Sequence, residues 1–135
     1  MNESVIIDLL KESYLYKQAI VNRIAINCKF VVIKNDQHYA LIMGPLTEFP
    51  YHANLVKYFC NHFDIPSGWI KKPDMYDILD KHYHINGGGW MEIDPVNKKI
   101  LLYGQSTAYG QFQPDDINTI VENTPEFKDY HIKMS

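Results

Sequence analysis

Apolar side chains recur with helical spacing in three segments of the chain. In the first, over about residues 5–25, they follow Ser4 at intervals of three and four residues, the pattern of an amphipathic helix. The second covers about residues 51–63 and starts just behind Pro50, a residue that favours the first turn of a helix. The third covers about residues 114–121 and has proline at its first position. The pattern therefore predicts three helices.

Runs of β-branched and aromatic residues predict strands in the rest of the chain. The predicted strands are residues 28–34, 39–43, 83–86, 89–94, 98–103 and about 130–133. Polar turns at residues 35–38 and 94–97 each join two neighbouring strands, so at least two hairpins are expected. Residues 69–81 allow a short helix around Pro73, for which the sequence indicates no role.

Together these elements predict an α+β fold in a single domain that spans residues 1–135. The sheet is expected to be mixed but mostly antiparallel, with about six strands flanked by helices and with the N-terminal helix as an extra element. With 46% hydrophobic residues, a chain of 135 residues can bury a core large enough to fold unaided. The sequence therefore requires no second domain.

Charge and composition narrow the classes of partner. A formal net charge of −3 argues against a general nucleic-acid-binding protein, because such proteins rely on clustered Lys and Arg. No apolar run is long enough to span a bilayer and no signal-peptide core is evident, so a cytoplasmic protein without a membrane partner is expected. Cys28 and Cys60 lack the spacing of a zinc site or a disulfide framework, and both are expected to be small buried hydrophobic residues.

The most informative stretch of the chain covers residues 87–110 and is rich in glycine. Three consecutive glycines precede a predicted hairpin, and Gly104 and Gly110 then bracket residues 105–109 after an apolar strand. Such a loop can direct several backbone N–H groups at one point, and a phosphate oxygen is the commonest guest for that geometry. The alternative is a loop that only reverses the chain, and the glycines alone do not decide between the two.

Among the histidines, His52 has the most informative position. It follows Pro50 at the start of a predicted helix, where unpaired N–H groups and the helix dipole disfavour a positive charge, so its imidazole should stay neutral. A neutral imidazole can accept a proton from water or attack phosphorus itself. His82 and His84 share one face of a predicted strand, but no third ligand is evident at a recognisable spacing, so neither a metal nor a cofactor is expected.

These features resemble the hallmark region of the janus family, whose best-known member is a small phosphohistidine phosphatase. The matching segment, residues 82–110, reads HYHINGGGWMEIDPVNKKILLYGQSTAYG. Upstream, residues 51–54 (YHAN) resemble the start of the family's main helix, which carries its catalytic histidine, and residues 29–34 (KFVVIK) resemble its first strand, which opens with a substrate-binding lysine. The resemblance covers roughly residues 28–133, so residues 1–27 are an added N-terminal helix outside a phosphohistidine-phosphatase-like core.

The resemblance implies a metal-independent phosphatase that hydrolyses the P–N bond of a phosphohistidine-containing protein or of a small phosphoramidate. It makes His52 the general base or the nucleophile and gives Lys29 the role of balancing the phosphate charge. It also makes the backbone N–H groups of Ser106, Thr107 and Ala108, with the Ser106 hydroxyl, a cradle for the phosphate oxygens.

The chain departs from the family pattern near the implied pocket. Trp90 stands where a basic residue is usual, and the connection between His62 and His82 is longer than in the family. Two alternatives therefore stand beside the enzyme. One is a phosphate-binding or phosphoprotein-binding module of the same fold that has lost turnover. The other is a purely structural or regulatory partner protein.

Overall fold

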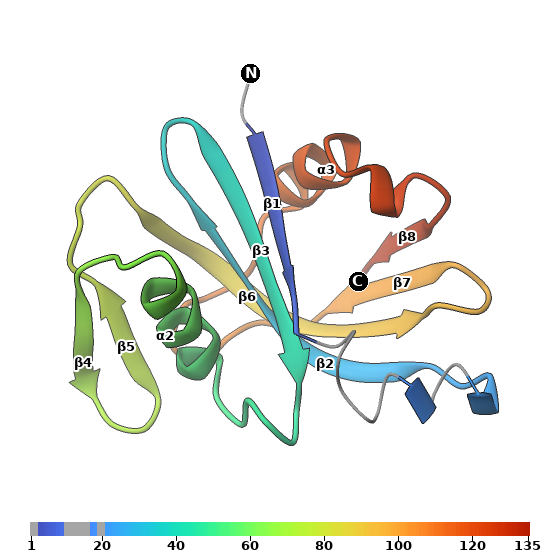
Figure 1. The fold of residues 1–135 in the computed structure, drawn as a ribbon, viewed down its shortest axis with the longest axis horizontal. Coiled ribbons are helices and arrows are strands. Elements are labelled where there is room, and N and C mark those ends of the chain that lie inside the picture. The colour runs from blue at the N-terminus through green and yellow to red at the C-terminus, as the bar shows by residue number, and fades with distance from the viewer. Residues whose placement is uncertain (1–2, 10–16, 19–20) are drawn as a thin grey trace.

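A computed structural model describes residues 3–9, 17–18 and 21–135 of the chain (Figure 1). The helices and strands, in chain order, are β1 (Glu3–Asp8), β2 (Ile26–Lys34), β3 (His38–Pro45), α2 (His52–His62), β4 (Ser67–Lys71), β5 (Met75–Ile78), β6 (His84–Asp94), β7 (Lys99–Tyr103), α3 (Pro114–Glu122), a 3-10 turn (Pro125–Phe127) and β8 (His131–Met134). The predicted helices at 51–63 and 114–121 are therefore confirmed as α2 and α3.

A six-stranded mixed sheet forms the centre of the molecule, in the order β1-β3-β2-β6-β7-β8. The three inner pairs are antiparallel, whereas β1 runs parallel to β3 and β8 runs parallel to β7. The β4–β5 hairpin forms a separate two-stranded sheet beside α2 (Figure 1). The predicted α+β class and the mixed, mostly antiparallel sheet are confirmed.

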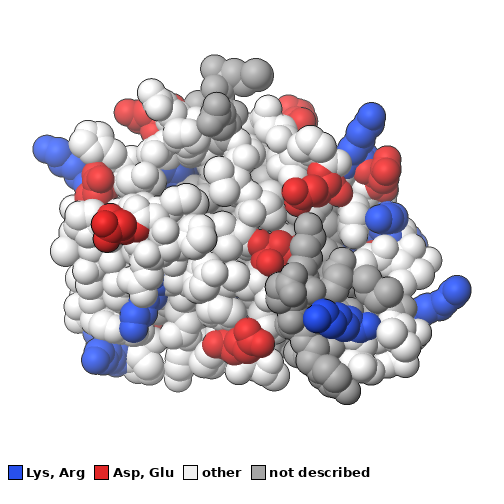
Figure 2. Space-filling model, viewed as in Figure 1, with Lys and Arg blue, Asp and Glu red and all other residues white. Residues whose placement is uncertain are grey.

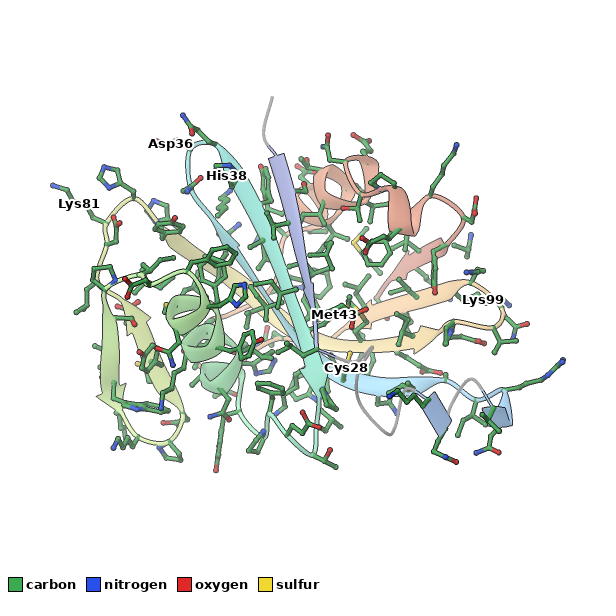
Figure 3. The ribbon with its side chains drawn as sticks, in the orientation of Figure 1. Cys28, Asp36, His38, Met43, Lys81 and Lys99 are labelled. Carbon is green, nitrogen blue, oxygen red and sulfur yellow. The ribbon has the colours of Figure 1, made fainter. Side chains whose placement is uncertain are left out.

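Alternating side chains of the central strands bury both faces of the sheet. Phe30 and Met43 belong to the core cluster that includes α3, while Val31 and Ile42 belong to the cluster that includes α2 and β5. Figure 3 shows Met43 in the middle of the sheet, whereas Lys99 extends from the end of β7. Each large apolar side chain buried in this way contributes about 1.5–3 kcal/mol to folding. The strands that carry the candidate site residues are therefore firmly held.

The N-terminal segment differs from the prediction. Residues 3–8 form β1, where the sequence predicts the start of a helix over residues 5–25. The run Val5, Ile6 and Ile7 is β-branched, and it pairs with the free edge of β3, so sheet pairing outweighs the local helical spacing. Residues 17–18 and 21–22 are helical, and the remaining predicted helix positions, 10–16 and 19–20, lie outside the described residues.

The segment predicted as a short helix, residues 69–81, is instead the β4–β5 hairpin. Tyr76 and Ile78 are buried while Met75 and Asp77 are exposed, which is the two-residue period of a strand rather than the period of a helix. The two buried residues belong to the same core cluster as α2. Packing against that helix therefore decides the structure of a segment whose local pattern is ambiguous.

Strand β6 joins two predicted strands, residues 83–86 and 89–94, through the glycine triplet. A Cβ atom on Gly88 would lie 2.5 Å from the carbonyl oxygen of Phe30, and one on Gly89 would lie 2.6 Å from that of Tyr103. Glycine is needed here because neighbouring backbone passes too close for a side chain. The triplet therefore serves close packing in the middle of the sheet.

Two further observations concern the described helices and the distribution of charged side chains. No described helix is both long enough and apolar enough to cross a membrane. On the face drawn in Figure 2, the acidic and basic side chains of the described residues are interspersed. That face therefore does not carry the clustered positive charge typical of nucleic-acid-binding surfaces.

Candidate functional site

A pocket of about 370 Å³ lies where the start of α2, strands β2 and β6, the loop after β7 and the β4–β5 hairpin meet. Its lining residues are Lys29, Tyr51, His52, Asp74, Met75, Trp90, Ser106, Thr107 and Ala108. All five residues that the sequence singles out for the site are among them. Segments up to about 80 residues apart in the chain are therefore brought together in the predicted combination.

His52 is the first residue of α2, and the first turn of that helix is fixed by its capping interactions. The backbone N–H of Tyr51 donates to Oδ1 of Asn54 (2.9 Å), and the Asn54 N–H donates to the Tyr51 carbonyl (3.0 Å). The His52 residue is only 7% exposed. Its Nε2 lies 2.9 Å from the carbonyl oxygen of Gly89, and its ring meets that of Trp90 edge to face at 5.2 Å.

This environment favours the neutral imidazole. Burial lowers the pKa of His52, the hydrogen bond to Gly89 opposes that shift, and the nearby charge of Lys29 lowers the pKa further. The direction agrees with the neutral state expected from the sequence, but its largest cause is burial rather than the helix dipole. Because a carbonyl only accepts, Nε2–H donates to Gly89 and Nδ1 carries the free lone pair.

Lys29 is held beside the histidine between two aromatic rings. Its ammonium donates to the carbonyl of Pro50 and lies 5.8 Å from the ring centre of Tyr51 and 5.7 Å from that of Trp90. Partial burial lowers the pKa of this ammonium group. Lys29 and Trp90 are direct partners across β2 and β6. Trp90, which the sequence marks only as a departure from the family, is therefore part of the pocket wall.

The loop after β7 turns at two glycines with positive φ, Gly104 (φ 71°) and Gly110 (φ 83°). Between them, the Ser106 N–H is shared by the carbonyls of Gly88 and Gly110, both at 3.1 Å, and its hydroxyl oxygen accepts the N–H of Tyr109 at 3.1 Å. The Ser106 N–H, to which the family resemblance gives a place in a phosphate cradle, is thus already engaged. It fastens the loop to β6 instead.

Two donors of the predicted cradle remain available. The backbone N–H groups of Thr107 and Ala108 have no acceptor among the described residues. Both residues line the pocket, and the Ser106 hydroxyl hydrogen is not needed for the bond that its oxygen accepts from Tyr109. The loop can therefore offer two N–H donors and one O–H donor to an anion.

The β4–β5 hairpin closes the pocket on one side and is tied to the loop by Tyr109. The Tyr109 hydroxyl donates to the carbonyl of Tyr76 (2.6 Å) and accepts its N–H (3.2 Å). Burial is the largest cause that raises the pKa of Tyr109 to about 12. The hairpin contributes Asp74 and Met75 to the lining. Sequence reasoning missed both residues, and the only signal for them is the added length of this connection.

A second cavity, of about 200 Å³, lies between β1, the β2–β3 turn and the end of α2. Most of its lining is apolar or aromatic, and its lysine, Lys34, is paired with Asp116 at 3.4 Å. It lacks the combination of a neutral buried imidazole and unengaged backbone donors. The chemistry expected for an anion therefore lies in the pocket at His52.

The other side chains considered as metal ligands are two histidines and two cysteines. The ring of His82 is paired with Asp80 at 2.9 Å, and His84 opens β6. Among the described residues, no group of three or more His, Cys, Asp or Glu side chains is arranged to hold a metal ion. Cys28 and Cys60 are buried free thiols, as predicted. Burial is the largest cause that raises the pKa of each thiol.

Comparison with known protein families gives a match over the part of the chain that builds the pocket. No curated protein matches the sequence. The model of the Janus/Ocnus family, Ocnus, matches residues 18–131. This span contains every residue that lines the pocket at His52 and leaves out β1. The chain therefore belongs to the Janus/Ocnus family.

Proposed function

We propose that this protein is a phosphatase that hydrolyses the phosphoramidate P–N bond of phosphohistidine without a metal ion. The observation that carries the proposal is the meeting of His52, Lys29 and the unengaged N–H groups of Thr107 and Ala108 in one pocket. P–N hydrolysis needs a group that handles one proton and donors that hold three phosphoryl oxygens. The pocket offers both.

In the proposed reaction, the Thr107 and Ala108 N–H groups and the Ser106 hydroxyl bind the phosphoryl oxygens. Lys29 balances their charge. Nδ1 of neutral His52 takes a proton from a water molecule as the water oxygen attacks phosphorus. The P–N bond breaks, and the departing nitrogen takes up a proton while inorganic phosphate is formed. The hydrogen bond from Nε2 to Gly89 holds the imidazole in the tautomer that this step requires.

His52 can instead attack phosphorus directly with Nδ1, so that the phosphoryl group passes from the substrate to the enzyme and then to water. The two routes differ in one observable species. Single-turnover samples analysed by intact-protein mass spectrometry contain a phosphorylated enzyme only on the second route. Its loss in His52→Ala would assign the modified residue.

The central test is phosphate release from a phosphohistidine peptide in the presence of a chelator. We expect release by the natural protein, and a loss of about 10²–10⁴-fold in His52→Ala, the range typical of a positioned acid–base group. His62→Ala is the matched control, because His62 is an exposed residue at the other end of α2 and does not line the pocket. Equal rates for the two variants, or loss of release with the chelator, would contradict the proposal.

A phosphohistidine-binding module without turnover is the second candidate. It is favoured by the 7% exposure of His52 and by the Trp90 ring against its edge, which both restrict access to the imidazole. For such a module, calorimetry shows binding of the phosphopeptide while no phosphate is released. Binding would then depend on Lys29 and tolerate His52→Gln, because only the enzyme needs a titratable ring.

A further inference from the structure

The β4–β5 hairpin adds a carboxylate to a pocket that the other elements equip for an anion. Asp74 lies in the turn between the two strands and lines the same pocket as Lys29 and Ala108. It forms no hydrogen bond or ion pair with any described residue. A negative group next to a phosphate site is unfavourable unless the ligand also carries a positive or N–H-bearing part. Asp74 is exposed, so water solvates its carboxylate, and a ligand in this pocket would meet its negative charge.

We propose that Asp74 binds the nitrogen side of the substrate and makes the pocket selective for phosphoryl groups bonded to a nitrogen group, such as an imidazolium ring or an ammonium, that is protonated or bears an N–H. This inference rests on the proposed function and names the chemical class that the site distinguishes. The phosphoryl oxygens face Lys29 and the loop, while an N–H of the nitrogen group donates to the carboxylate. A ligand with this division of charge matches both signs in the pocket.

The hairpin is held firmly enough for such a role. Tyr76 is 5% exposed, and both its backbone N–H and its carbonyl are bound by the Tyr109 hydroxyl. Its own hydroxyl is 2.7 Å from Oγ of Ser67, and its ring meets Trp69 edge to face. Asp74, in the turn of this hairpin, lines the pocket together with Ser106, Thr107 and Ala108 of the loop.

Oxygen esters of phosphate lack the group that Asp74 would bind. Their bridging oxygen carries no hydrogen and cannot donate a hydrogen bond to the carboxylate. The carboxylate then only repels the negative charge of the phosphoryl group. In phosphoramidate the nitrogen bonded to phosphorus carries hydrogen, and in protonated phosphohistidine the other ring nitrogen carries it, so either ligand can donate a charge-assisted hydrogen bond to the carboxylate. The carboxylate thus rejects one class of substrate and retains the other.

Binding measurements separate this inference from the proposed catalysis. The probes are phosphoramidate, a zwitterion with nitrogen bonded directly to phosphorus, and methyl phosphate, an oxygen ester whose bridging oxygen carries no hydrogen. Affinities are measured by calorimetry in the His52→Ala protein, so that the ligand is not consumed. Adding Asp74→Asn should weaken phosphoramidate about tenfold, because the side-chain oxygen of the new asparagine still accepts the hydrogen bond but no longer carries the charge that strengthens it. Methyl phosphate should bind equally well or more tightly, because a repulsive charge is removed.

Asp77→Asn is the matched control, because it makes the same charge change on the same hairpin at a residue that does not line the pocket. It should change both affinities little and equally. Parallel losses for the two ligands in Asp74→Asn, or failure of phosphoramidate to bind more tightly than methyl phosphate before that change, would overturn the inference. Retained selectivity in a protein that releases no phosphate would instead refute the phosphatase and leave the role of Asp74 standing.

Discussion

Replacing Tyr109 by phenylalanine tests whether the loop and the hairpin form one structural unit. The change removes a single oxygen atom, and with it both hydrogen bonds to the backbone of Tyr76. Each bond contributes about 1 kcal/mol net, and leaving a buried donor or acceptor unsatisfied costs about 1–3 kcal/mol. Because Tyr76 is 5% exposed, water does not readily replace the lost partner. We expect a loss of about 2–4 kcal/mol in the free energy of unfolding.

Urea unfolding followed by circular dichroism measures this loss. For an m-value of about 2 kcal/mol per M, the midpoint should fall by about 1 M or more. Tyr103→Phe is the control, because Tyr103 is half-buried on β7 and its hydroxyl forms no hydrogen bond with the described residues. It should stay within about 0.5 kcal/mol of the natural protein. If the two variants lose the same stability, Tyr109 does not couple the hairpin to the loop.

The pH dependence of folding and activity should reflect the lowered pKa of His52. In the unfolded chain this histidine binds its proton at about pH 6.5, so the free energy of unfolding should fall as the pH drops below that value. The slope of the free energy of unfolding against pH, measured by denaturation at several pH values, should be smaller in His52→Gln. The acid limb of kcat/KM should likewise lie below about 6.5, and a limb above it would contradict the assignment of His52 as the base. Gly88→Ala should destabilise the protein by about 1–3 kcal/mol in chemical denaturation, as overpacking does, because the new Cβ would meet the Phe30 carbonyl at 2.5 Å. Gly68→Ala, where no atom lies within 4 Å of the added Cβ, should be nearly neutral, and equal losses would refute the packing argument.

Two parts of the candidate site, His52 and the loop after β7, carry local sequence signals, whereas Lys29 is assigned only through the resemblance to the family. His52 sits behind a proline at a helix start, and Gly104 and Gly110 frame a loop after an apolar strand. Each of these signals depends only on near neighbours in the chain. The internal bonding of the Ser106 N–H could not be anticipated in this way, because its acceptor Gly88 comes from a different strand.

The parts of the fold that the sequence did not predict depend on distant partners. Strand β1 pairs in parallel with β3, some 35 residues away, while its own sequence also fits a helical period. The β4–β5 hairpin depends on burial of Tyr76 and Ile78 against α2. Glycines in the middle of β6 suggest an interruption, although close approach of neighbouring backbone is what requires them. Local sequence patterns do not determine such long-range contacts.

The two outer strands of the main sheet, β1 and β8, come from opposite ends of the described chain. Each runs parallel to the strand that it covers. The backbone of β7, from Lys99 to Leu102, therefore acquires its outer partner only once residues 131–134 have been synthesised. A nascent chain, or one cut before His131, presents that row of amides and carbonyls to solvent, where a strand from another molecule can pair with it. Loss of β8 would thus move the free edge of the sheet from β8, a strand of four residues, to the backbone of β7.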